Sequence, residues 1–80
     1  MSNTVSRIAQ NTAETILAAF AGQTVHEDEV YNQIEMQYAL SNKRTTMGSY
    51  AQVLGWINSK GAKSHYTGPN YTGDHLYVFP

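Results

Sequence analysis

The spacing of apolar residues changes near residue 63 of this 80-residue chain, and this change restricts the fold more than any other feature. Before that point apolar residues recur every three or four positions, as on one face of a helix, whereas residues 75–79 alternate, as in a strand. Two β-rich segments around the turn-forming residues 68–73 predict a hairpin, which has to pack on helices because an isolated hairpin is barely stable in water. The sequence therefore predicts an α+β fold of helices followed by a C-terminal hairpin.

Composition restricts how such a fold is held together. The chain has no cysteine, which excludes disulfides, zinc thiolates and a thiol nucleophile, so a dispersed apolar core has to hold it. Its length predicts one domain over residues 1–80, and no apolar run approaches the roughly 20 residues that span a bilayer. The N-terminal segment lacks the layout of a secretory signal. We expect a cytoplasmic protein with no membrane association.

The first helix is expected over about residues 3–21. Ser2, Asn3 or Thr4 can cap its start, and Gly22 can end it in the left-handed conformation. Alternatively, a capping box of Asn11 and Glu14 starts the helix near residue 12. Its apolar face has residues three and four apart, namely Val5, Ile8, Ala9, Ala13, Ile16, Leu17 and Phe20.

The second helix follows the short extended pair Thr24 and Val25. Thr24 and Glu27 have the spacing of a capping box, and the acidic residues 27–29 suit the first turn of a helix because they complement its dipole. Capping therefore explains these carboxylates better than catalysis does. An apolar stripe continues to about residue 40 and consists of Val30, Tyr31, Ile34 and Tyr38.

The third helix is expected over about residues 45–59, capped by Thr45 or Asn42 and ended by Gly61. Gly48 and Gly55 fall off its apolar stripe and leave a surface that another molecule can approach closely. Trp56 is expected either to pack under the hairpin or to be an exposed interface residue. The apolar stripe itself consists of Met47, Tyr50, Val53, Leu54 and Ile57.

Charge is distributed unevenly. Residues 1–42 carry one basic and five acidic side chains, whereas residues 43–80 carry four basic side chains and one acidic one, although the net charge is only −1. No acidic residue occurs between Glu35 and Asp74. Such an asymmetry gives one face a positive potential, unless these are ordinary solubilising charges.

This order of helix, extended pair, helix, turn, helix and hairpin resembles the winged helix-turn-helix superfamily over about residues 4–79. The resemblance implies a non-catalytic DNA-binding protein or transcriptional regulator that binds double-stranded DNA as a homodimer. In that family the third helix enters the major groove and the hairpin, or wing, contacts the backbone. Matching positions here are Lys43, Arg44, Thr45, Thr46, Ser49, Gln52, Lys60, Lys63, His65, Asn70 and Tyr71.

The chemistry of these side chains suits DNA. Arg44 can bind a phosphate or guanine, Gln52 can pair with adenine, and the lysines can follow the backbone. However, the sequence pI of about 6.2 and the position of cations only at the two ends of the third helix predict weak binding. The alternative is a protein-interaction module or inhibitor on the same fold that does not bind DNA.

Catalysis, metals and cofactors are not expected. No serine lies in a G-x-S-x-G elbow, and no phosphate-binding loop is present in the sequence. His26, His65 and His75 lack the spacing of metal ligands, although the last two are placed to face each other across the hairpin.

Overall fold

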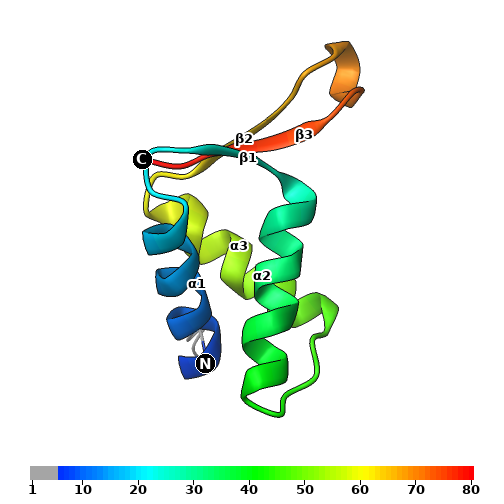
Figure 1. Cartoon of the computed structure of the whole chain (residues 1–80). Coiled ribbons are helices and arrows are strands. Elements are labelled where there is room, and N and C mark those ends of the chain that lie inside the picture. The colour runs from blue at the N-terminus through cyan, green and yellow to red at the C-terminus, as the bar shows by residue number, and fades with distance from the viewer. Residues whose placement is uncertain (1–5) are drawn as a thin grey trace.

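The computed structural model describes residues 6–80, which form three helices and one antiparallel sheet. This confirms the predicted α+β class, a helix-turn-helix followed by a hairpin wing (Figure 1). A short 3-10 helix, η1, forms the tip of the wing. The elements, in chain order, are α1 (Arg7–Ala19), β1 (Thr24–His26), α2 (Glu27–Leu40), α3 (Met47–Ser59), β2 (Lys63–Tyr66), η1 (Pro69–Tyr71) and β3 (His75–Val78).

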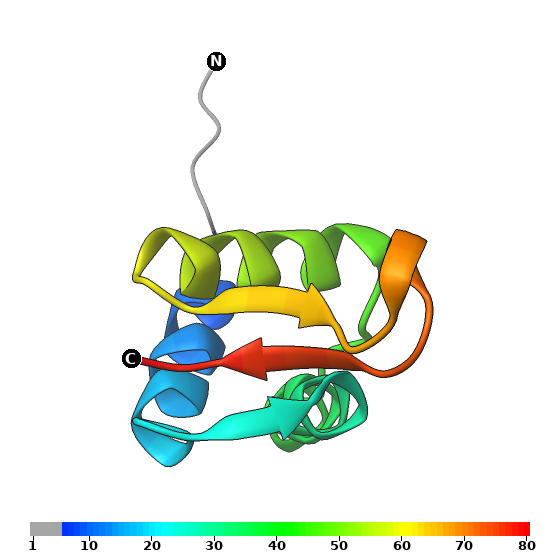
Figure 2. The same cartoon turned by 90° about the horizontal axis from the view of Figure 1, so that it is seen from above.

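The sheet has the strand order β1-β3-β2, so the last strand of the chain lies between the other two. Tyr77 of β3 pairs with Val25 on one side and with Ser64 on the other. The extended pair expected before the second helix is therefore a true strand. Seen from above, the sheet lies over one end of the helices, with β2 on the side of α3 and β1 on the side of α2 (Figure 2).

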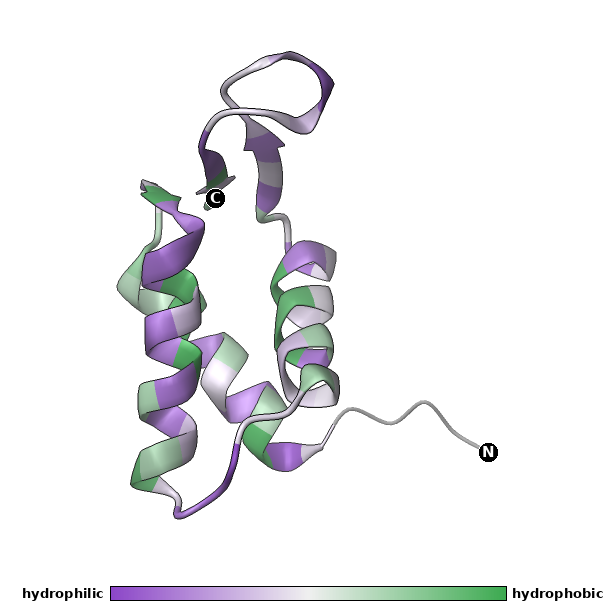
Figure 3. Ribbon diagram, turned by 90° about the vertical axis from the view of Figure 1, so that its right-hand side faces the viewer, coloured by the Kyte–Doolittle hydropathy of each residue, from purple (hydrophilic) through white to green (hydrophobic). Residues whose placement is uncertain are grey.

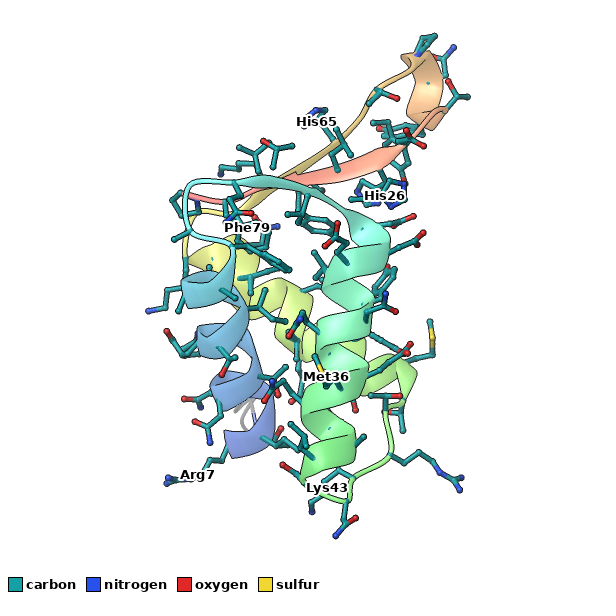
Figure 4. The ribbon with its side chains drawn as sticks, viewed as in Figure 1. Arg7, His26, Met36, Lys43, His65 and Phe79 are labelled. Carbon is teal, nitrogen blue, oxygen red and sulfur yellow. The ribbon has the colours of Figure 1, made fainter. Side chains whose placement is uncertain are left out.

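The core contains residues from all three helices and is closed by the sheet. Tyr77 and Phe79, which lie on the same face of the C-terminal strand segment, are buried beneath the sheet, and Phe79 points toward the helices (Figure 4). Phe79 also contacts Phe20 after α1, with ring centroids 5.5 Å apart. The largest fully buried side chains are those of Ile16, Val30, Ile34, Val53 and Ile57.

Helix α1 starts later than the sequence predicted. Ser6 caps it, because the Ser6 Oγ accepts a hydrogen bond from the Ala9 nitrogen at 3.3 Å. The expected caps at positions 2–4, and Val5, lie outside the described residues. The alternative start near residue 12 is wrong, since Asn11 is inside the helix and its carbonyl accepts a bond from the Thr15 hydroxyl.

The caps of the other two helices also differ from the prediction. Thr24 pairs with Val78 in the sheet, so it cannot cap α2, and the Nδ1 of His26 accepts from the Asp28 nitrogen instead. The three carboxylates of residues 27–29 do occupy the first turn of α2. Helix α3 is capped by Thr46 and not by the expected Thr45 or Asn42.

The hydrophilic connection between α2 and α3 lies at the end of the molecule opposite the wing (Figure 3). It contains Asn42, whose φ of 56° turns the chain, and the two basic residues 43 and 44. Within residues 6–80, none of the helices has the length and apolar character needed to cross a membrane.

Candidate nucleic-acid interface

The start of α3 is built by two of the side chains that we expected to contact DNA. The Thr46 Oγ1 accepts from the Ser49 nitrogen at 3.2 Å, and the Ser49 Oγ accepts from the Thr46 nitrogen at 3.2 Å. This reciprocal capping box satisfies backbone donors that a helix end otherwise leaves unpaired. Thr45, also expected to contact DNA, is half-buried just before the cap. The first role of the Thr46 and Ser49 side chains is therefore to cap α3, and a contact with DNA would come in addition to this role.

The outward face of α3 is uncharged and includes two glycines. A Cβ added at Gly55 would meet no atom within 4 Å, and one at Gly48 would meet only the Thr46 hydroxyl at 3.6 Å. Met47, expected on the buried stripe, is 84% exposed, because the helix begins at this residue and its first turn extends beyond the core. The exposed residues of this face are Met47, Gly48, Ala51, Gln52, Gly55, Asn58 and Ser59.

The side-chain oxygen of Gln52 already accepts hydrogen bonds within the protein. Its Oε1 accepts from both the backbone nitrogen and the hydroxyl of Ser6, each at 3.1 Å. These bonds join the start of α1 to the middle of α3 across 46 positions of sequence. An adenine contact uses both the oxygen and the nitrogen of a glutamine amide, so the expected pairing requires Gln52 to release Ser6.

The expected cations are divided between the two ends of α3 and a cleft lined by residues of α1 and α2. Lys43 lines a cleft together with Arg7 of α1, at the end of the molecule away from the wing (Figure 4). Arg44 lies between Lys43 and the cap of α3, whereas Lys60 and Lys63 follow the C-terminal end of α3 and begin the wing. Within residues 6–80 none of these five basic side chains forms an ion pair, since every ion pair there uses a histidine.

Trp56 lies at the junction of α1 and α3. Its indole nitrogen donates to the Glu14 Oε2 of α1 at 2.9 Å, and the ammonium of Lys60 lies 5.1 Å from the ring centroid. Trp56 is half-buried, and its hydrogen bond is with α1. Trp56 is therefore not the freely exposed interface residue that was one of the two expectations. Sequence reasoning missed its partner Glu14 because the two residues are 42 positions apart.

The wing presents the remaining expected residues to solvent. Lys63 and His65 lie on the edge strand β2, and Asn70 and Tyr71 form the tip, where both have a φ near 60°. Tyr71 is 84% exposed, and its ring meets that of Tyr66 edge-on at 5.6 Å. The tip therefore offers an aromatic ring and polar groups on a defined turn.

The expected pairing of the two wing histidines is wrong. Tyr66, not His65, pairs with His75 in the sheet, and their rings stack at 4.3 Å. The His75 Nδ1 lies 2.8 Å from the Glu27 Oε2, which fastens β3 to the start of α2. In the part of the chain that the structure describes, no three histidine or carboxylate side chains lie close enough together to bind a metal ion.

His26 connects the base of the wing to α2. Because its Nδ1 accepts the capping bond from the Asp28 nitrogen, the ring proton is assigned to Nε2. This Nε2 faces the Asp74 Oδ1 at 3.6 Å. Asp74, the acidic residue of the wing, thus faces His26 at the start of α2 and not the edge strand β2.

Burial of Tyr77 predicts a pH-dependent stability. Burial, followed by the neighbouring Tyr31, Glu27 and Tyr66, raises the pKa of Tyr77 from 10 to about 12. Between these values the unfolded chain releases the tyrosine proton while the folded chain keeps it, so stability falls as pH rises. Urea unfolding should show a loss of about 2 kcal/mol between about pH 9 and pH 11.5 that Tyr77→Phe removes.

In the Tyr77→Phe variant a smaller decline of the same sign should persist, because the pKa of Tyr31 is also raised, chiefly by burial. Equal pH profiles for the variant and the parent protein would contradict the assignment to Tyr77.

Together the structure defines a small α+β protein in which a helix-turn-helix is followed by a wing, with the α3 face and strand β2 on one side (Figure 2). Comparison with protein-family models, curated proteins and solved structures found no match. The resemblance to the winged helix-turn-helix superfamily therefore stays a prediction.

Proposed function

We propose that the protein is a small, non-catalytic DNA-binding protein, a transcriptional regulator of the winged helix-turn-helix type acting in the cytoplasm. Its α3–β2 face, formed by the exposed side of α3 and by β2, contacts double-stranded DNA. One observation carries the proposal: α3 and β2 contribute no carboxylate to this face, because the chain has none between Glu35 and Asp74, and its flanking cations are free of ion pairs. The carboxylates of Glu14 and Glu35 contact α3 at Trp56 and Tyr50, which are half-buried. Phosphates are attracted by such a surface and repelled by carboxylates.

The small residues of α3 support the same proposal. Gly48 and Gly55 leave the helix backbone open to close approach, which suits a helix lying in a groove. Arg44 at one end and Lys60 with Lys63 at the other are placed to contact phosphates on either side of the helix. Such a domain reads one half-site, so we propose a homodimer on DNA.

Salt dependence is the first test. Fluorescence anisotropy of a labelled random duplex should show micromolar binding at about 50 mM salt, because three or four phosphate contacts give only weak non-specific affinity. Raising the salt to about 200 mM should weaken binding by about 40- to 150-fold, as expected from release of three or four counterions. Absence of binding at either salt concentration would contradict DNA binding.

Charge reversal locates the binding face. Lys63→Glu should weaken binding about tenfold at low salt, because one phosphate contact at about 50 mM salt contributes roughly that factor. Arg7→Glu is the matched control for the wing, since it changes net charge equally but lies at the far end of the molecule, in the cleft that Lys43 also lines (Figure 4). Equal losses in both variants would show that only net charge matters. Lys43→Glu with Arg44→Glu tests the α2–α3 connection in the same assay.

A second candidate function is protein binding on the same fold without DNA. It is favoured by the exposed apolar side chains of Leu40, Met47 and Tyr71, and by the absence of cations on the α3 face itself. Protein that does not bind DNA at either salt concentration but forms a stable complex with a protein partner would favour this candidate.

A further inference from the structure

A cleft with a cavity volume of about 240 Å³ lies between α2 and the start of α3. Tyr31 and Glu35, four residues apart on α2, form one side, and Met47 and Tyr50, three apart on α3, form the other. These spacings place each pair on one face of its helix. We call this site, lined by Tyr31, Glu35, Met47 and Tyr50, the tyrosine cleft.

The tyrosine cleft has the chemistry of a site for a cation. The rings of Tyr31 and Tyr50 lie 5.3 Å apart at 80° and so make a corner. Aromatic faces carry partial negative charge and attract ammonium and guanidinium groups. The hydroxyl of Tyr50 donates to the Glu35 Oε2 at 2.7 Å, which fixes the carboxylate beside the rings. Within residues 6–80, Glu35 forms no ion pair with any cation.

The surroundings of the cleft are also negative. Burial raises the pKa of Tyr31 first, and the charges of Glu27 and Asp28 and the nearby Tyr66 and Tyr50 raise it further. Carboxylates therefore lie close to tyrosines around the cleft, which borders the α3–β2 face at Met47. A phosphate chain is disfavoured here, and a positively charged group is favoured.

The wing extends this surface. Tyr66 stacks on His75, whose Nδ1 lies 2.8 Å from the Glu27 Oε2 of α2, and it contacts the exposed Tyr71 at the tip. Aromatic rings thus lie along the wing from its tip to the start of α2, where Glu27 precedes Tyr31 by about one helical turn. A row of this kind suits an extended polypeptide whose one charged side chain enters the cleft.

We propose that the tyrosine cleft binds an arginine or lysine side chain from an extended segment of a partner protein. Charge complementarity supports this occupant, since the cleft holds a carboxylate that no cation of the described chain neutralises. A guanidinium can stack on one tyrosine while donating to the free oxygen of Glu35. Met47, 84% exposed at the rim, can pack its flexible thioether on the aliphatic part of the side chain. The proposal does not rest on DNA binding, although Met47 belongs to both surfaces.

The test is a peptide titration followed by backbone amide NMR of the whole protein. The probe is a short glycine–serine peptide with one central arginine, and its control carries glutamine at that position. The arginine peptide should shift the resonances of Tyr31, Glu35 and Tyr50 only at high peptide concentration, because a cation–π contact is worth about 1 kcal/mol and even a Kd of about 1 mM requires about 4 kcal/mol. Equal shifts with the glutamine peptide would overturn the proposal.

Variants separate the cleft from general electrostatics. Glu35→Gln should weaken binding of the arginine peptide at least about threefold, whereas Glu29→Gln, an exposed carboxylate on the same helix, should have little effect. Tyr31→Leu should weaken binding about two- to fivefold through loss of an aromatic face, with retained spectral dispersion showing that the variant folds. Equal effects of Glu35→Gln and Glu29→Gln would overturn the proposal.

A second copy of the chain is the competing occupant, because Arg44 is exposed and unpaired. In that case the resonances of the cleft would shift with protein concentration in the absence of peptide, and Arg44→Gln would abolish the shifts. That outcome would overturn the assignment to a separate partner.

Discussion

Ile34→Ala should lower the free energy of unfolding by about 3 kcal/mol. The Ile34 side chain is fully buried in the middle of α2, within the core that joins the three helices to β3. Truncation removes three carbon atoms and leaves a cavity that rigid neighbours such as Val30 and Ile57 fill only in part. In a domain of this size the midpoint of thermal unfolding should fall by roughly 10–25 °C.

Met36→Ala is the control for this prediction. Met36 lies two residues further along α2, on the opposite face, and is 47% exposed. Its truncation should change stability by no more than about 0.5 kcal/mol. Both variants are compared by urea unfolding monitored by circular dichroism. Similar losses for the two variants would mean that the buried face of α2 is not the one described.

Periodicity predicted the helices and the hairpin because burial of an apolar face fixes their type and approximate length. Helix starts were predicted less well, since several serines, threonines and asparagines near each start are equally able to cap. Thr24 illustrates the cause: its capping-box spacing with Glu27 is genuine, but pairing with Val78, 54 positions away, holds it in a strand. Strand pairing between residues so far apart in the sequence cannot be predicted from the spacing of neighbouring residues.

The candidate interface was predictable in outline and not in detail. The acid-free stretch and the cations at the ends of α3 are visible in the sequence. The bonds from Gln52 to Ser6 and from Trp56 to Glu14 depend on how α1 lies against α3, which no local spacing encodes. The tyrosine cleft was missed because Tyr31 and Tyr50 follow the apolar stripes of their helices and looked like ordinary core residues. They lie at the edge of that core, where one side of each ring remains available.

Gly73→Ala should destabilise the wing by at least about 2 kcal/mol. Gly73 has a φ of +80°, a conformation that costs a residue with a Cβ about 1–2 kcal/mol. The added carbon would also lie 2.5 Å from the Thr67 Oγ1 and 2.8 Å from the Gly68 nitrogen. The turn cannot yield easily, because the Asp74 nitrogen donates to the Thr67 Oγ1 and the Thr67 nitrogen donates to the Asp74 carbonyl, both at 2.9 Å.

The same substitution at Gly55 provides a control with the opposite sign. Gly55 is exposed in the middle of α3 and a Cβ there meets no atom, so Gly55→Ala should stabilise the protein by up to about 1 kcal/mol. Amide hydrogen exchange distinguishes the two variants: Gly73→Ala should speed exchange in β2 and in the tip while leaving α1 and α2 protected. Uniform loss of protection would show that the wing and the helices unfold together.

Gly73→Ala also separates the contributions of the wing and of α3 to DNA binding. If Lys63 and the tip contact the backbone, loosening the wing should weaken binding and flatten its dependence on salt by about one counterion per lost contact. If Arg44 and the α3 start also contact DNA, those contacts should persist, because the capping box of Thr46 and Ser49 lies outside the wing. Unchanged affinity and unchanged salt dependence in a variant with a demonstrably loosened wing would restrict the interface to α3, and the wing would then serve mainly to extend the aromatic surface beside the tyrosine cleft.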